Sequence, residues 1–307
     1  MQGFSPSTKD GKGENVEEIT LLKKAVNKLF ECLADDEEEE GNFIKTVNDI
    51  LEWSVKEDND NYTTGVEIFK DLLSTTSSKR HRKQLRQKMD KIMILLLKKS
   101  SSNINAYIVC IEVVAQLVAM GNGLFHRNDF SLVFQALTSE VKESRIQDFC
   151  RIFTAKFTIL SWSLFFYSEN VYGLIHIFIP CVRELLESLL RNSCRDISSD
   201  PLCPTEETDL LNCSNKMARL YQEISSHKDV MSKYSLYLLA DCIHVISCHG
   251  ARAPIRQVIV QGVYYIFDLC NDDCLTKLHV YLPNNQRELF RSLKEDYTAH
   301  HKFKGNA

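Results

Sequence analysis

The densest group of side chains able to bind metal or act as nucleophiles lies near residue 245. It contains Cys242, His244, Cys248 and His249, with Cys270 and Cys274 further along the chain. Zinc modules usually separate paired cysteines by about two to four residues on turns, whereas five residues separate Cys242 from Cys248. Cys242 and His249 instead fall on the apolar stripe of a predicted helix. We therefore expect core packing, with no metal and no cofactor; a thiol or metal enzyme around Cys242 and His249 is the alternative.

Other motifs of catalysis and nucleotide binding are missing from the sequence. There is no GxSxG, HExxH, GxGxxG or GxxxxGK[ST] pattern. The segment Gly121-Asn-Gly123 follows a predicted helix rather than a strand, which is typical of a helix stop. Asp272 and Asp273 are adjacent in a predicted turn, where carboxylates usually cap and remain solvated. We therefore expect no enzyme and no catalytic residues.

Positive charge concentrated between residues 79 and 99 is the strongest interaction signal. The candidate contact residues are Lys79, Arg80, Arg82, Lys83, Arg86 and Lys88. Such side chains neutralise phosphates and release counterions, so they bind RNA without reading its sequence. A direct RNA-binding module over 79–99 is therefore one hypothesis, and a nuclear localisation signal is another. The segment also fits an ordinary solvated helix face or a partner for the acidic run Asp35 to Glu40.

The composition indicates a folded, helical chain. Of 307 residues, 44% are apolar and 25% are charged, as in an average soluble globular protein, so disorder of the whole chain is excluded. The 11 glycines and 6 prolines are about half the usual share, which favours long helices joined by few turns. A net charge of −4 excludes a basic nucleic-acid coat. The 11 cysteines are odd in number and several lie in apolar runs, which favours free thiols in a reducing compartment.

Two apolar stretches are candidates for a membrane span. The first, residues 103–120, carries Glu112, which would be costly in a bilayer. The second, residues 157–182, is interrupted by Ser168-Glu-Asn170 and by Pro180, which predicts two pieces too short to cross. The polar residues 1–15 predict no secretory signal. We therefore expect no contact with a membrane.

Apolar periodicity predicts about a dozen helices and no strand. The predicted ranges are 15–33, 42–55, 62–74, 103–120, 130–137, 141–166, 171–190, 209–224, 229–248, 255–270 and 285–301, with a further stripe at Leu85, Met89, Ile92, Met93 and Leu96. Such a chain fits an all-α fold, an irregular stacked helical array of the armadillo or HEAT kind (an α-solenoid), although no strict repeat is visible. We expect a disordered segment 1–14, a helical array 15–192, a loop 193–208 and a C-terminal helical domain 209–304.

The end of the sequence has a recognisable pattern. It consists of LYQEISSHK at 220–228, Lys233-Tyr234, VYYIFDLC at 263–270, RELFRSLKEDY at 287–297 and His301-Lys302. These segments resemble the C-terminal domain of the unhealthy ribosome biogenesis protein 2 family, most densely over residues 215–304. Lys294 departs from the pattern, because an aromatic residue is expected there.

The resemblance implies a nucleolar factor for assembly of the large ribosomal subunit and processing of its precursor RNA. The implied partners are other assembly factors in pre-ribosomal particles, and precursor ribosomal RNA. The family implies no catalytic residues, which fits a non-enzymatic scaffold. Its members are much longer, so the chain would be a carboxyl-terminal portion or a short isoform. The family-motif positions are Tyr264, Asp268, Phe290, Asp296 and Tyr297, for which we expect structural roles in the terminal helices, with partner contact as the second interpretation.

Overall fold

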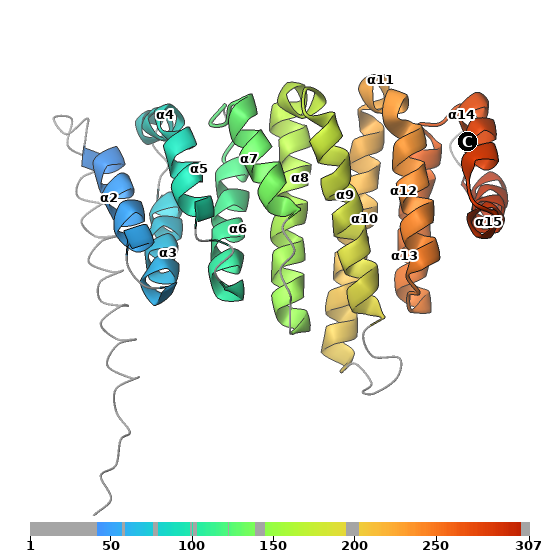
Figure 1. The fold of residues 1–307 in the computed structure, drawn as a ribbon, viewed down its shortest axis with the longest axis horizontal. Helices are drawn as coiled ribbons and strands as arrows, with labels where there is room; N and C mark the ends of the chain where they lie inside the picture. The colour runs from blue at the N-terminus through green and yellow to red at the C-terminus, as the bar shows by residue number, and fades with distance from the viewer. Residues whose placement is uncertain are drawn as a thin grey trace, which may run out of the picture. The chain divides into compact units, whose positions relative to one another are not determined.

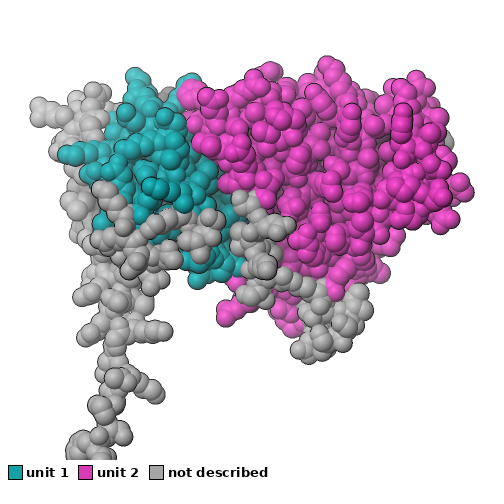
Figure 2. All heavy atoms as spheres, viewed as in Figure 1, with its two compact units in different colours: residues 1–117 teal, residues 118–307 magenta. Residues whose placement is uncertain are grey.

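The computed structural model describes residues 42–56, 59–75, 79–98, 100, 103–121, 123–138, 145–194 and 203–301. Within these ranges every regular element is a helix, so the fold is all-α, as predicted (Figure 1). The predicted helix 15–33, the acidic run 35–40 and the segment 1–14 lie outside the described residues. The chain divides into two compact units, Met1–Leu117 and Val118–Ala307 (Figure 2).

Unit 1 is built from short helices around a small apolar core. The helices are α2 (Asn42–Lys56), α3 (Asn59–Thr75), α4 (Lys79–Gln87), α5 (Met89–Lys98) and most of α6 (Ile104–Ala119). Helix α2 packs against α3, α4 and α5. The predicted stripe from Leu85 to Leu96 is buried as expected. The helix is interrupted at Lys88, where a turn separates α4 from α5. Two ion pairs of 2.6 Å join helices, Lys91 to Glu52 and Lys70 to Glu112.

Unit 2 contains the longer helices. They are α7 (Arg127–Leu137), α8 (Ile146–Tyr172), α9 (Ile175–Ser193), α10 (Pro204–Ser226), α11 (Lys228–Met231), the 3-10 turn η2 (Ser232–Tyr234), α12 (Ser235–Cys248), α13 (Ala253–Phe267), α14 (Asp272–Tyr281) and α15 (Asn284–His300). Helix α10 packs between α8 and α13, while α9 lies against α8, α10 and α12 (Figure 1). Helix α12 in turn contacts α13, α14 and α15.

Helix α8 corrects one prediction from the sequence. The polar residues Ser168 to Asn170 do not interrupt it, because they occupy exposed or half-exposed positions and the helix continues to Tyr172. It bends instead at Tyr167, whose φ of −136° and ψ of 33° are not helical. The Tyr167 hydroxyl donates to the Gly121 carbonyl at 2.9 Å and accepts from the Leu124 amide at 3.2 Å. These two hydrogen bonds fix Gly121 and Leu124, which follow α6, beside the bend of α8 at Tyr167.

Length and composition allow α8, and none of the other described helices, to cross a membrane. Core helices meet the same criterion, and 56% of the most apolar window of α8 is buried inside the protein. The stretch 157–182 is divided between two helices as predicted, but the break lies at Gly173 and Leu174, and α8 begins at Ile146. The prediction that both pieces are too short to span a membrane was therefore wrong. The reason is that polar side chains on the outer face of a helix do not end it.

Two further differences from the prediction arise from capping at the N-termini of helices. Helix α10 begins at Pro204 rather than at 209, since proline suits the first turn and Glu206 accepts a 3.1 Å hydrogen bond from the Cys203 amide. Helix α14 was not predicted: the side chain of Asn271 caps it by accepting from the Cys274 amide at 2.8 Å. The predicted loop 193–208 lies inside unit 2, and a domain boundary there stays a prediction.

Helices α10 and α13 approach each other closely at Gly262. A Cβ atom at that position would lie 2.7 Å from the Ala218 Cα and 3.2 Å from the Tyr221 ring. Backbone atoms cannot yield as a flexible side chain can. Glycine is therefore required at this crossing, and Tyr221 is fully buried beside it.

We expect Gly262→Ala to lower the free energy of unfolding by about 1–3 kcal/mol, because the added methyl group overpacks the contact between α10 and α13. Chemical denaturation followed by circular dichroism measures this change. Gly250→Ala is the matched control, since its Cβ would meet only the Cys194 sulfur at 3.6 Å. Equal stability of the two variants would contradict the packing argument.

Candidate interaction surfaces

The C-terminal helix α15 docks on α13 through stacked aromatic rings. The Phe267 ring of α13 stacks on Phe290 and Tyr297 of α15, with centroid separations of 6.0 and 5.1 Å. The sequence places Phe290, Leu293 and Tyr297 three and four residues apart, so they share one face of α15. All three are buried, and this face fixes α15 in the fold.

Asp268 joins the same two helices by hydrogen bonds. Its Oδ1 atom accepts from the Tyr297 hydroxyl at 2.7 Å, and its Oδ2 atom lies 3.0 Å from the His301 Nε2 atom. Burial raises the pKa of Tyr297, and the hydrogen bond to Asp268 and its negative charge raise it further. Burial also raises the pKa of Tyr264, with a smaller contribution from the charge of Asp296. Both phenols are therefore neutral donors at neutral pH.

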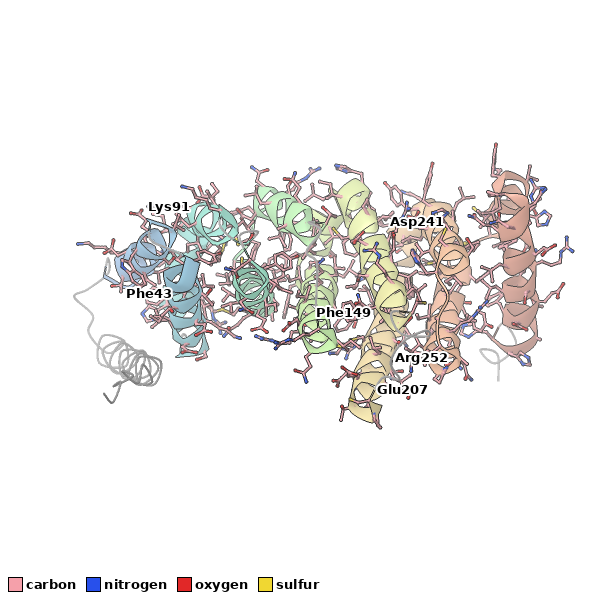
Figure 3. All side chains as sticks on the ribbon, turned by 60° about the horizontal axis from the view of Figure 1, so that its bottom comes forward. Phe43, Lys91, Phe149, Glu207, Asp241 and Arg252 are labelled. Atoms are coloured by element: carbon pink, nitrogen blue, oxygen red, sulfur yellow. The ribbon has the colours of Figure 1, made fainter. Side chains whose placement is uncertain are left out.

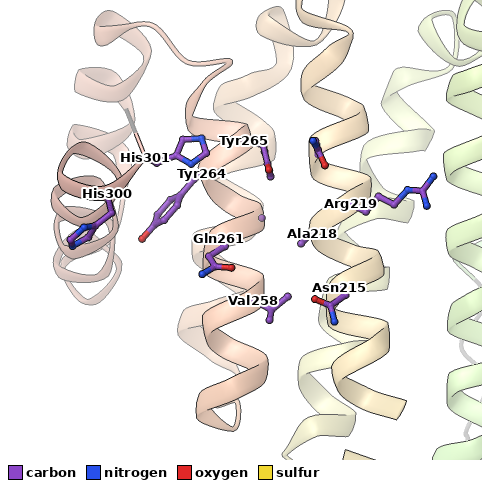
Figure 4. Close-up of a pocket in the computed structure, with 11 residues that line it drawn as sticks. Asn215, Ala218, Arg219, Val258, Gln261, Tyr264, Tyr265, His300 and His301 are labelled. Atoms are coloured by element: carbon purple, nitrogen blue, oxygen red, sulfur yellow. The ribbon is translucent and has the colours of Figure 1, made fainter. Parts of the chain in front are cut away.

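A cavity of about 510 Å³ opens beside this cluster, between α10, α13 and α15 (Figure 4). Its lining is mainly polar or aromatic and includes Asn215, Arg219, Gln261, Tyr264, Tyr265 and His301. Arg219 extends away from α13 (Figure 4) and donates to the Glu223 carboxylate at 2.9 Å. These side chains can hold a polar group by hydrogen bonds and stacking, but the lining contains no cysteine, serine or carboxylate able to act as a nucleophile.

The structure therefore brings together some of the family-motif positions and separates others. Tyr264, Asp268 and Tyr297 form one cluster, with the Tyr264 ring centroid 5.9 Å from that of Tyr297. Phe290 lies in the core, and Asp296 is exposed on α15. Direct contact of any of them with a partner stays a prediction.

The predicted basic contact residues differ in how far the structure exposes their side chains. Lys83, Arg86 and Lys88 are exposed, whereas Arg82 is half-buried. Lys79 and Arg80 belong to α4, but their side chains lie outside the described ones. The opposite side of α4 is anchored by buried Leu85 and by His81, whose ring stacks on Phe43 at 4.2 Å. Lys91, which is labelled in Figure 3, is also basic, but its ammonium group donates to the Glu52 carboxylate at 2.6 Å.

The cysteine and histidine cluster near residue 245 is divided in the fold: His244 and Cys248 stay in contact, with the sulfur 3.7 Å from the His244 Nε2 atom, whereas Cys242 and His249 have other partners. Cys242 is buried and its thiol donates to the Tyr221 hydroxyl at 3.2 Å, while Cys248 is exposed. Burial raises the pKa of the Cys242 thiol to about 12, so the thiolate that a nucleophile needs is scarce at neutral pH. His249 instead faces Glu187 at 3.5 Å. Among the described residues no three histidine, cysteine or acidic side chains converge on a metal position.

Sequence reasoning missed one exposed surface, the α8 aromatic patch formed by Trp162, Phe165 and Phe166. The sequence predicts a helix over 141–166 that contains all three residues, but no exposed face was assigned to it. A signal was present, because these residues are spaced three and four apart from Trp162 and thus share one face of the helix. Their exposure depends on which neighbours pack against α8, which the sequence does not reveal.

We expect Tyr297→Phe to lower the free energy of unfolding by about 1 kcal/mol, because it removes the hydrogen bond from a buried hydroxyl to Asp268. Urea denaturation measures the change. Tyr237→Phe provides the control, since that side chain is 62% exposed and the variant should match the parent chain. A Tyr297→Phe variant as stable as the parent would exclude a stabilising role for the bond.

Comparison with known proteins identifies a family that the chain matches. No solved structure matches the chain. A model of the Urb2/Npa2 family matches residues 108–306, about two-thirds of the sequence, beginning within α6. This match confirms the resemblance of the C-terminal residues and extends it towards the N-terminus. The chain belongs to the Urb2/Npa2 family, a family of ribosome biogenesis factors.

Proposed function

We propose that the chain is a non-enzymatic scaffold in nucleolar precursors of the large ribosomal subunit and takes part in pre-rRNA processing. Membership of the Urb2/Npa2 family is the observation that carries this proposal. The proposed partners are other assembly factors of these particles. The proposal includes a division into a helical array 15–192 and a C-terminal helical domain 209–304, joined by 193–208.

We further propose that the helices stack as an irregular array of the armadillo or HEAT kind. The packing within unit 2 supports this, because α8, α10 and α13 are successive neighbours and α9 and α12 lie against them as a second layer. In such arrays each helix pair contacts only its neighbours, so long flanks stay open to other molecules. The open cavity at α10, α13 and α15 lies on one such flank.

If the scaffold proposal is right, a tagged chain will concentrate in the nucleolus, and its depletion will cause precursors of large-subunit RNA to accumulate. Fluorescence microscopy and hybridisation to precursor RNA measure the two effects. Precursors of small-subunit RNA are the internal control and should change less. Exclusion of the chain from the nucleolus, together with unchanged RNA processing, would overturn the proposal.

A second candidate function is direct RNA binding through the basic segment 79–99. The specific observation in its favour is the exposure of Lys83, Arg86 and Lys88. Lys83 and Arg86 are three residues apart on α4 and therefore share a face, so both can reach one phosphate backbone. Phosphate contacts of this kind position a strand without selecting its sequence.

For this second function, we expect the triple variant Lys83→Gln, Arg86→Gln, Lys88→Gln to weaken RNA binding and flatten its salt dependence. Each lost phosphate contact should reduce the log–log slope by about 0.7 for a single strand. Fluorescence anisotropy between low and physiological salt measures both quantities. The control changes three exposed cations of unit 2, Lys228, Lys233 and Arg256. Equal losses in both triple variants would refute a role specific to this segment.

A further inference from the structure

Two cysteines face each other across the contact between α8 and α10. These helices run in the same direction, and the Lys216 ammonium of α10 donates to the Thr154 hydroxyl of α8 at 2.7 Å (Figure 1). Cys150 lies four residues before Thr154, and Cys213 lies three residues before Lys216. Each cysteine is therefore about one turn earlier on the same face of its helix, which places the two thiols opposite each other.

The two thiols interact with each other, and this interaction makes them chemically unequal. Hydrogen bonding with Cys213 lowers the pKa of the Cys150 thiol, and the charge of Lys216 lowers it further, against the effects of burial and of Asp209 and Glu206. The same hydrogen bond, together with burial, raises the pKa of the Cys213 thiol. Cys150 is half-buried, whereas Cys213 is 1% exposed. Cys150 thus combines thiolate character with access for a small reagent, which a reactive cysteine needs.

Other buried thiols among the described residues are bound differently. Oxygen atoms at 3.2–3.3 Å accept hydrogen bonds from the sulfurs of Cys110, Cys181 and Cys242. Cys270 lies near Cys274, but burial raises the pKa of the Cys270 thiol to about 11, so little thiolate is present there at neutral pH. The pair on α8 and α10 differs, because it joins a thiol that ionises more easily to a second sulfur.

We propose that Cys150 is a site of oxidation by hydrogen peroxide and that Cys213 completes a disulfide bond joining α8 to α10. In the first step the Cys150 thiolate attacks one peroxide oxygen, and the oxygen–oxygen bond breaks. The Cys150 sulfur becomes a sulfenic acid. The hydroxide that leaves takes up the proton that the Cys150 thiol released, which gives water. The sulfur thereby loses two electrons to the peroxide.

Cys213 supplies the second sulfur of the disulfide. It attacks the Cys150 sulfur, the sulfur–oxygen bond breaks, and the departing hydroxide takes the Cys213 proton to form a second water. The charge of the Cys150 thiolate, which helps to raise the pKa of Cys213, is absent from the sulfenic acid, so Cys213 ionises more readily at this stage. A disulfide places the sulfurs about 2.05 Å apart, which hydrogen-bonded thiols reach through small side-chain movements.

Peptide mapping of the full chain tests the proposal directly. The Cys203→Ser, Cys248→Ser variant is the starting protein, because it lacks two exposed thiols that would link separate molecules. The reduced protein is treated with hydrogen peroxide at neutral pH, the peroxide is removed, and the remaining thiols are blocked with N-ethylmaleimide in denaturant. Trypsin and a glutamate-specific protease then release peptides 146–151 and 208–216, which contain Cys150 and Cys213. We expect mass spectrometry to find these two peptides joined by a disulfide, whereas their recovery as separate blocked peptides would overturn the proposal.

Single variants in the same background separate the two steps. In Cys213→Ser, Cys150 should stop at the sulfenic acid, which dimedone traps, whereas in Cys150→Ser the buried Cys213 should stay reduced. Cys274→Ser is the matched control, since it removes a half-buried cysteine outside the pair and should leave the yield of joined peptides unchanged. Circular dichroism verifies the fold of each variant. Trapping of dimedone on Cys213 instead of Cys150 would contradict the assigned order.

Unfolding in urea before the oxidation tests whether the fold brings the two sulfurs together. The yield of the joined peptides should then fall at least about tenfold, because a long flexible loop rarely closes on one particular partner. An equal yield from the native and the unfolded chain, or a native chain that links Cys270 to Cys274 instead, would overturn the proposal. All measurements use the purified chain, so their outcome is independent of the proposed nucleolar role.

Discussion

The central packing contact of unit 2, between α10 and α13, depends on a glycine, because Gly262 of α13 has no side chain where the two helices meet. Gly262 brings the backbones of α10 and α13 so close that a single methyl group would collide with the Ala218 Cα. The buried face of α10 then packs against α8 on one side and α13 on the other. Since close-packed interiors transmit strain, the position of α10 determines the geometry on both sides of it.

The outer face of the same helix supplies residues to two cavities of unit 2. Arg219 lines the larger cavity beside α13 and α15 and the smaller one beside α8, and Glu223 lines the second. One helix therefore combines a structural contact with two surfaces of different chemistry, one rich in phenols and imidazoles and one rich in aromatic carbon with a carboxylate. This arrangement suits a protein whose role is to bring other molecules together.

The helical content of the chain and much of its core could be predicted from apolar spacing. The stripe from Leu85 to Leu96 and the face of α15 containing Phe290 and Tyr297 are buried as their spacing indicates. Helix ends were harder to predict, because they depend on single hydrogen bonds such as that of Asn271 to the Cys274 amide. Helix α14 was missed for that reason.

The candidate sites were less accessible to sequence reasoning than the fold. The basic segment could be identified from charge alone, but only the structure separates exposed Lys83 and Arg86 from Lys91, which Glu52 engages. Asp268 and Tyr297 are far apart in the sequence and meet only through the docking of α15. The α8 aromatic patch depends on which faces of α8 the neighbouring helices leave uncovered. No local pattern encodes such long-range pairings.

The burial of thiols has a consequence for the chemistry of the whole chain under oxidising conditions. Burial raises the pKa of Cys110, Cys181 and Cys242 to about 12, so these sulfurs resist conversion to sulfenic acid. Cys203 and Cys248 are exposed. Among the described cysteines, the exposed sulfurs of Cys203 and Cys248 are therefore open to oxidants and electrophiles, whereas the three buried thiols are protected from them.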